Sequence, residues 1–194
     1  MISAAEVRAT KGRRRISVLT AYDYPTAFAL DQVGLDLILV GDSLAMVELG
    51  FPSTREATLE MMCHHTRAVR TGAVNTHVVG DLPAGSYATV ADAVATAKAL
   101  VEAGADSVKL EGPMIDQVCA IIAAGIPVMG HVGLLPQTAE VFRKEGKTPQ
   151  EADRIAREAR ALADAGCYAV VIEAVPPDLA TRITAEVAVP TIGI

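Results

Sequence analysis

Residues 35–43 read LDLILVGDS, an apolar run that leads directly into Asp42 and Ser43. A run that is apolar at almost every position is typical of a strand in a parallel sheet with both faces covered. The same pattern recurs in five other stretches: ISVLTAYD, THVVGDLP, ADSVKLEG, IPVMGH and YAVVIEAVP. In a parallel barrel all strands point the same way, so we expect these polar ends to converge on one face. That face is where barrel enzymes place their chemistry.

Helical stretches alternate with the apolar runs. Three of them begin with the sequences STRE, TVAD and TPQE, in which a hydroxyl residue precedes an acidic residue by three positions. The spacing is typical of a capping box at a helix N-terminus. It predicts helices that start at Ser53, Thr89 and Thr148 and that run to Gly72, Gly104 and Gly166.

Repeated strand–helix units predict a (βα)8 TIM-barrel type of α/β fold, or an open doubly wound sheet. An eight-stranded barrel typically needs about 250 residues, and this chain has 194. We therefore predict one barrel-type catalytic domain over residues 1–194, apparently truncated after about seven strands and lacking the last βα unit. Completion of the barrel by another chain is an alternative. The predicted strands cover 16–21, 36–41, 76–80, 106–110, 127–130, 168–173 and 189–193.

Composition narrows the possible partners and compartments. The net charge is −6 without a basic stripe, which argues against a nucleic-acid partner. There is no run of about 18 apolar residues, so we expect no membrane span. Cys63, Cys119 and Cys167 are odd in number and lack a CxxC spacing. They are predicted to be buried or half-buried in a reducing cytoplasm, which makes the protein cytoplasmic.

Asp42 and Asp81 are the strongest candidates for a functional pair. Each ends an apolar run, and two carboxylates at neighbouring strand ends provide hard oxygen ligands suited to Mg²⁺ or Mn²⁺. The structural alternative is that each Asp caps the helix that follows it.

Lys109 and Glu111 lie two positions apart on a predicted strand, so their side chains point to the same face. They are either site residues or partners in a structural ion pair. His131 and Glu173 follow two further apolar runs, and Glu173 is a candidate general base. His77 begins a strand, at the end opposite the predicted site, and is interpreted as structural.

The chain resembles the ketopantoate hydroxymethyltransferase (3-methyl-2-oxobutanoate hydroxymethyltransferase) family, within the phosphoenolpyruvate/pyruvate barrel superfamily. The resemblance extends from about residue 11 to residue 194. The stretches that carry it, in the family's order, are KGRRRISVLTAYDYPTA, LILVGDSLAM, HHTRAVRTGA, DLPAGSY, AGADSVKLEG, IPVMGHVGLLPQ, VVIEAVP and VPTIGI.

The resemblance implies a function in pantothenate biosynthesis, on the route to coenzyme A. The reaction would be Mg²⁺-dependent transfer of a hydroxymethyl group from 5,10-methylenetetrahydrofolate to 3-methyl-2-oxobutanoate, giving 2-dehydropantoate through a metal-stabilised enolate. It also implies a homo-oligomer whose partners are a small 2-keto acid and folate. The implied roles are metal binding by Asp42, Asp81 and Glu111 (through a water), substrate binding by Ser43, Lys109 and His131, and catalysis by Glu173 as general base.

The chain departs from the family pattern in three places. The segment RKEGKT is shorter than the expected Gly-rich loop, Ala84 and Leu135 replace a typical Phe and Thr, and the eighth strand is missing. Two alternatives follow: another Mg²⁺-dependent lyase or decarboxylase of 2-keto acids from the same superfamily, or a non-catalytic remnant.

Overall fold

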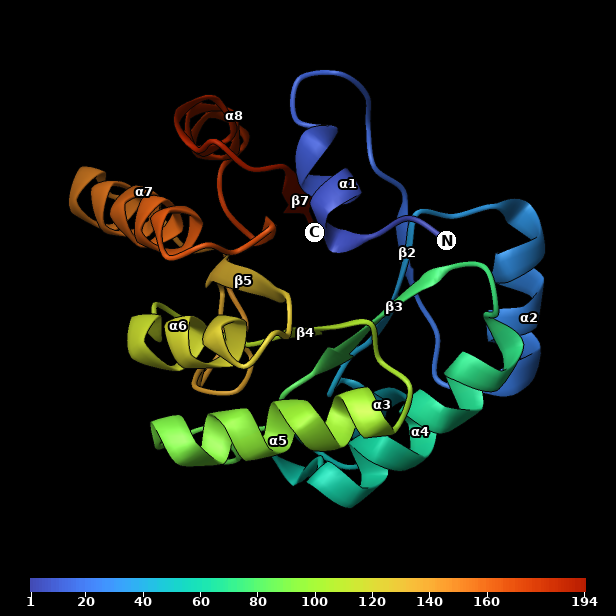
Figure 1. The fold of residues 1–194 in the computed structure, drawn as a ribbon. Coiled ribbons are helices and arrows are strands. Elements are labelled where there is room, and N and C mark those ends of the chain that lie inside the picture. The colour runs from blue at the N-terminus through green and yellow to red at the C-terminus, as the bar shows by residue number, and fades with distance from the viewer.

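Seven parallel strands form one sheet, and their order in the sheet is their order in the chain (Figure 1). The computed structural model describes residues 1–194. The strands are β1 (Val18–Thr20), β2 (Leu37–Val40), β3 (His77–Asp81), β4 (Ser107–Lys109), β5 (Val128–Gly133), β6 (Ala169–Glu173) and β7 (Thr191–Gly193). Every predicted strand is present, with bounds shifted by at most three residues.

The sheet curves into a nearly closed α/β barrel, which confirms the predicted fold class. Strands β1 and β7 are its two edges, because β1 pairs only with β2 and β7 only with β6. Both edge strands line one cavity of about 750 Å³, so they face each other across a seam. The cavity is lined by none of the charged candidate residues Asp42, Asp81, Lys109, Glu111, His131 and Glu173.

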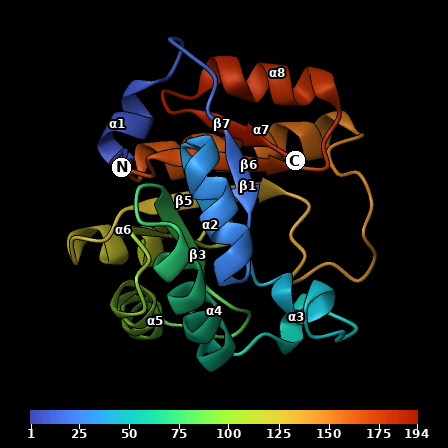
Figure 2. The same cartoon turned by 90° about the vertical axis from the view of Figure 1, so that its right-hand side faces the viewer.

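Helices alternate with the strands along the chain, and most of them cover the outside of the sheet (Figures 1 and 2). They are α1 (Ala4–Ala9), α2 (Tyr24–Val33), α3 (Leu44–Val47), the 3-10 helix η1 (Thr54–Glu56), α4 (Leu59–Gly72), α5 (Val90–Glu102), α6 (Ile115–Ala123), α7 (Pro149–Asp164) and α8 (Pro177–Glu186). No helix has the length and apolarity needed to cross a bilayer.

Two of the three predicted helix starts are confirmed. Thr89 and Thr148 each form a complete capping box, with Asp92 and Glu151 respectively. The prediction for Ser53 is wrong: this residue caps only the single turn of η1, and Ala57 then adopts an extended conformation. The helix that runs to Gly72 begins instead at Leu59, where Thr58 is the N-cap.

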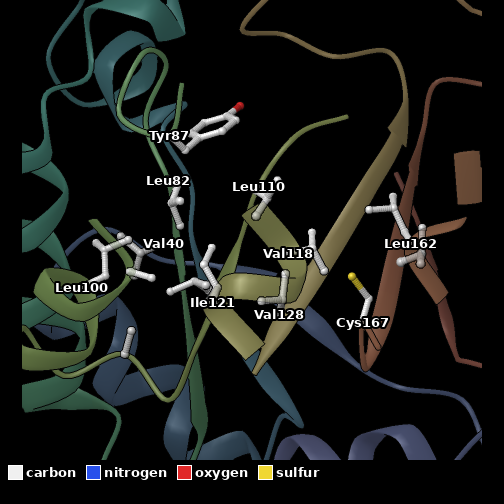
Figure 3. Close-up of a cluster of buried hydrophobic side chains, with 14 of the residues drawn as sticks. Val40, Leu82, Tyr87, Leu100, Leu110, Val118, Ile121, Val128, Leu162 and Cys167 are labelled. Atoms are coloured by element: carbon white, nitrogen blue, oxygen red, sulfur yellow. The ribbon is translucent and has the colours of Figure 1, made fainter. Parts of the chain in front are cut away.

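The core separates into two layers because side chains alternate along each strand. A cluster of 38 buried residues lies between the sheet and the helices and includes Ile38, Val40 and Val170. Figure 3 shows part of it, with Val40 and Val128 of the strands beside Leu100, Ile121 and other residues of the helices.

A second cluster of eight buried residues lies inside the barrel, and it includes Leu37, Val79, Met129 and Val171 from the strands. Helix α1 contributes Ala4 and Val7 to it. Leu37 starts its strand, so α1 covers the amino-terminal end of the barrel. The carboxyl-terminal end of the interior is left for polar residues.

The cysteines are not disulfide-bonded, but the burial prediction is wrong for one of them. Cys63 and Cys167 are buried, whereas Cys119 is exposed on α6. Cys119 lies on the outward face of that helix because its neighbours Val118 and Ile121 are the residues that pack against the sheet.

Candidate active site

The side chains of Asp81, Lys109, His131 and Glu173 share one face of the sheet. Each lies an even number of positions from an inward-facing residue of its strand, such as Val79 in β3. The alternation of side chains therefore directs all four into the barrel, near its carboxyl-terminal end. Asp42 joins them from the turn after β2 and Glu111 from the segment after β4, and all of these except Glu173 are at most 5% exposed.

The two aspartates lie together at the ends of β2 and β3. The backbone N of Asp42 is 3.5 Å from Oδ2 of Asp81, and Oδ1 of Asp81 is buried without a hydrogen-bond partner. Burial, and then the charge of Asp81, raise the pKa of Asp42 to about 7. Neither carboxylate caps the helix that follows it, since α3 has no side-chain cap and α5 is capped by Thr89. Asp23, by contrast, caps α2 through Thr26.

Lys109 forms an ion pair with Asp81, not with Glu111. The distance from Nζ of Lys109 to Oδ2 of Asp81 is 2.8 Å, and both side chains are buried. Burial by itself lowers the pKa of Lys109, but the carboxylates of Asp81, Glu111 and Asp42 outweigh it and raise that pKa above its ordinary value. The ammonium therefore stays charged and partly offsets the surrounding negative charge.

His131 lies between Lys109 and Glu173. Its Nδ1 is 3.5 Å from the Lys109 ammonium and its Nε2 is 3.1 Å from Oε2 of Glu173. An ammonium only donates, so Nδ1 is the acceptor and Nε2 carries the proton on the side of Glu173. Nε2 approaches Glu173 closely without hydrogen-bond alignment. Burial, and then the charge of Lys109, lower the pKa of His131, so the ring is neutral.

Glu173 is the most accessible carboxylate of the group, with 20% of its side chain exposed. It ends β6 beside Ala174, which has an unusual positive φ of 48°. Gly133 on the neighbouring strand has a φ of +99°, and a Cβ there would lie 2.2 Å from the carbonyl oxygen of Glu173. The backbone around Glu173 is thus tightly constrained.

Glu111 is also buried near this group, but it does not form a three-carboxylate cluster with the two aspartates. Its Oε1 is 3.8 Å from Nδ1 of His131, and its Oε2 accepts a hydrogen bond from the backbone N of Gln137. Burial raises the pKa of Glu111 to about 8, with Asp81 adding to the effect and Lys109 opposing it.

Three residues without a predicted role belong to the site. The hydroxyl of Tyr22 is 2.7 Å from Oγ of half-buried Ser43. Gln137 donates to Asp42, and Tyr87 donates to Gln137. Tyr22 follows the apolar run of β1, a signal that was available in the sequence. Gln137 lies in a segment without periodicity, 95 positions from Asp42.

The arrangement of Asp42 and Asp81 fits a divalent cation. Two adjacent buried carboxylates, one with an unpartnered oxygen, provide hard oxygen donors and need a positive charge to be stable together. The structure has no group of three or more His, Cys, Asp or Glu side chains set to hold one metal ion. Protein ligation would therefore come from these two aspartates, with other positions open to water or substrate.

His77 is placed as the sequence predicted. His77 opens β3 at the other end of the barrel, where its ring contacts the carbonyl oxygen of Ile2 and the hydroxyl of Ser107. His65 contacts the carbonyl oxygen of Tyr22, and the rings of His64 and His65 meet edge to face.

Solved structures of barrel enzymes resemble this fold. Phosphonopyruvate hydrolase superposes with a TM-score of 0.78 at 16% identity, covering 100% of this chain and 72% of that one. A 2,3-dimethylmalate lyase described as a member of the PEP mutase/isocitrate lyase superfamily superposes with a TM-score of 0.71, also at 16% identity, and it covers the same shares. At these identities the likeness concerns the fold alone.

Sequence comparison is more specific. The chain is 48% identical to 3-methyl-2-oxobutanoate hydroxymethyltransferase of Oleidesulfovibrio alaskensis, over 100% of this chain and 69% of that protein. It is 50% identical to the enzyme of that name from Thermus thermophilus, over 97% of this chain and 74% of that protein. It is 51% identical to the enzyme of that name from Moorella thermoacetica, over 100% of this chain and 75% of that protein. The profile of the family described as ketopantoate hydroxymethyltransferase matches residues 2–194. This chain belongs to the ketopantoate hydroxymethyltransferase family.

Proposed function

We propose that the protein transfers a hydroxymethyl group from 5,10-methylenetetrahydrofolate to 3-methyl-2-oxobutanoate, with Mg²⁺ held by Asp42 and Asp81. The observation that carries the proposal is the buried Asp42–Asp81 pair, with Oδ1 of Asp81 unpartnered and Lys109 alongside. Membership of the family supports the choice of substrates. A bound Mg²⁺ supplies Lewis-acid polarisation of the 2-keto acid, which acidifies the hydrogen on C3.

Lys109 is suited to bind the substrate carboxylate. An ammonium has three N–H donors, and the contacts with Asp81 and His131 use two of them. Ser43 presents a hydroxyl from the turn after β2, held by Tyr22, and Nε2 of His131 has no hydrogen-bond partner within the protein. We assign substrate binding to these three residues because each offers a donor to an anionic 2-keto acid.

Glu173 is the base that we assign to the C3 proton. It is the one carboxylate of the group with substantial exposure, so a substrate that enters from solvent can reach it. The C3–H bond breaks as the proton moves to Glu173, and C3 then forms the new carbon–carbon bond with the folate-borne one-carbon unit. The two carbon–nitrogen bonds that hold the one-carbon unit on the folate break, and water provides the hydroxyl group. The C3 proton and the second proton of that water pass to the two nitrogens, and tetrahydrofolate and 2-dehydropantoate are released.

The wider setting belongs to the same proposal. The product places the protein in pantothenate biosynthesis, on the route to coenzyme A. We also propose a cytoplasmic homo-oligomer, in line with the family resemblance. Glu111, buried near His131, is assigned to hold a water of the cation site rather than the cation itself.

Deuterium exchange at C3 of 3-methyl-2-oxobutanoate, followed by proton NMR, tests the first step without folate. We expect exchange that requires Mg²⁺ and that falls by about 10²–10⁴-fold in Glu173→Gln, the usual contribution of a general base. Exchange that is independent of Mg²⁺, or unchanged in Glu173→Gln, would contradict the assignment. Exchange without folate-dependent product formation would favour another 2-keto acid enzyme of this fold.

The cation site has its own prediction. Asp42→Asn and Asp81→Asn should each abolish Mg²⁺-dependent exchange while the circular dichroism spectrum stays that of the wild type, because each removes a charged ligand and keeps the side-chain shape. Asp116→Asn, at an exposed position on α6, is the matched control and should retain full exchange. Mg²⁺-dependent exchange at the wild-type rate in either site variant would rule out the cation site.

A further inference from the structure

We propose that Gln137 is a positioning residue, which holds the carboxylate of Asp42 for the cation without neutralising it. The inference deepens the proposed function and rests on it. Gln137 lies in the segment between β5 and α7 and is only 6% exposed. Its Nε2 donates to Oδ2 of Asp42 at 2.8 Å and to the carbonyl oxygen of Leu82 at 2.9 Å.

The orientation of the Gln137 amide is determined by its partners. Oε1 accepts from the hydroxyl of Tyr87, so both N–H groups and the carbonyl oxygen are used. Flipping the amide would turn Oε1 towards the carboxylate of Asp42 and the carbonyl of Leu82, which are both acceptors. The side chain therefore has one favourable orientation. The contacts of the amide with Tyr87 and Leu82 determine the direction in which its N–H group points at Asp42.

The backbone of Gln137 is anchored as firmly as its side chain. Its N–H donates to Oε2 of Glu111 at 3.1 Å, and its carbonyl oxygen accepts from Nε of Arg55 at 2.8 Å. Nη2 of Arg55 also donates to the carbonyl oxygen of Ala139. Gln137 thus connects the ends of β2, β3 and β4, through Asp42, Leu82 and Glu111 respectively.

Each of the two aspartates accepts a side-chain hydrogen bond through one carboxylate oxygen, but the two donors differ in charge. Oδ2 of Asp81 is bound by the Lys109 ammonium, and its Oδ1 is left without a partner. Oδ2 of Asp42 is bound by a neutral amide. A second cation in place of Gln137 would cancel the remaining negative charge of the pair and weaken its attraction for a divalent ion. A neutral donor orients the carboxylate and keeps that attraction, which is the usual task of groups that support metal ligands.

Mn²⁺ binding to the full chain, followed by the electron paramagnetic resonance signal of free Mn²⁺, tests the inference without substrate or turnover. Gln137→Met keeps the side-chain length and removes every donor and acceptor. We expect it to weaken Mn²⁺ binding by about 10–100-fold. Gln150→Met, the same substitution at an exposed position on α7, is the matched control and should bind Mn²⁺ at the wild-type level.

The outcomes separate this inference from the proposed function. Failure of the wild type to bind Mn²⁺ would overturn the cation site and, with it, the role of Gln137. Binding by the wild type that is unchanged in folded Gln137→Met would overturn only the role of Gln137. An equal loss in Gln150→Met would do the same, since it would show that the weaker binding does not depend on the contact between Gln137 and Asp42.

Arg55→Ala decides the question if Gln137→Met does not fold. Arg55 is exposed, so its truncation leaves the core intact while it releases the carbonyl oxygens of Gln137 and Ala139. Weaker Mn²⁺ binding at an unchanged thermal midpoint would support the positioning role. Wild-type Mn²⁺ affinity in this variant would contradict it.

Discussion

His77 and His131 show how position along a strand determines what a buried histidine does. His131 lies towards the carboxyl-terminal end of the barrel and faces Glu173 and the Lys109 ammonium. His77 starts β3 at the opposite end, where its ring is bonded to the carbonyl oxygen of Ile2 and to Ser107. In both, burial is the main cause of a pKa below the ordinary value. We propose that the first binds substrate, and we expect the second to affect stability.

Acid should destabilise the fold through His77. Burial lowers the pKa of His77 in the folded protein, with Asp106 opposing the shift and Arg70 adding to it. Between that pKa and the value of about 6.5 in the unfolded chain, the unfolded state binds more protons. The stabilisation is therefore present above about pH 6.5 and is lost as the pH falls through the folded-state pKa.

Urea unfolding of the wild type and His77→Gln, at about pH 7.5 and about pH 5, measures this contribution. We expect the free energy of unfolding to fall less on acidification in His77→Gln than in the wild type. His64→Gln, at an exposed position on α4, should follow the wild type. An equal fall in the free energy of unfolding between the two pH values, in the wild type and in His77→Gln, would contradict the prediction.

At the level of elements, contacts between segments override local helix signals. The sequence STRE at Ser53 has capping-box spacing, yet it forms only the single turn of η1. The side chain of Arg55 in that turn is bonded to the segment that carries Gln137, and Ala57 is buried in an extended conformation. These tertiary contacts hold the turn in place, and α4 begins afresh at the next residue able to cap it, Thr58.

Helices α2 and α4 approach each other closely at Gly72, the last residue of α4. A Cβ at Gly72 would lie 2.5 Å from the carbonyl oxygen of Tyr24 and 2.8 Å from the backbone N of Phe28. Gly72→Ala should therefore destabilise the protein by about 1–3 kcal/mol, the usual cost of overpacking. Helix propensity alone would predict the opposite sign, by about 1 kcal/mol.

The free energy of urea unfolding distinguishes the two effects. Gly193→Ala is the control, because a Cβ at that position has no neighbour within 4 Å and its φ is not positive. Its stability should stay near that of the wild type. A stabilised Gly72→Ala would show that the helices adjust without cost.

Across the whole molecule, we expect the backbone amides of the sheet to differ in their protection from hydrogen exchange, because the two edge strands face a seam. Ala21 donates to the carbonyl of Leu39, and Leu37 donates to that of Ser17, so odd-numbered residues of β1 bond to β2. Backbone direction alternates along a strand, so Val18 and Thr20 direct their N–H groups towards the seam. The same reasoning applies to Thr191 and Gly193 of β7, since Ile194 and Pro190 bond to β6.

Hydrogen exchange followed by NMR should reveal this gradient. The amides of Val18, Thr20, Thr191 and Gly193 should exchange fastest among the strands, and those of β3 to β5 slowest, since the latter strands are paired on both sides. Protection at the seam equal to that of β4 would mean that another group covers the seam in solution.

The sequence alone determined the βα alternation, all seven strands and the identity of the charged residues that end them. Apolar runs and capping signals are local features of the sequence. Parallel topology then brings the strand ends that carry Asp81, Lys109 and Glu173 to one face of the barrel. Tertiary structure decided which of these side chains pair. Lys109 meets Asp81 rather than Glu111, and Gln137 reaches Asp42 across 95 positions of the chain. Such pairings depend on how strands and loops lie in space, and neither periodicity nor residue spacing encodes that placement.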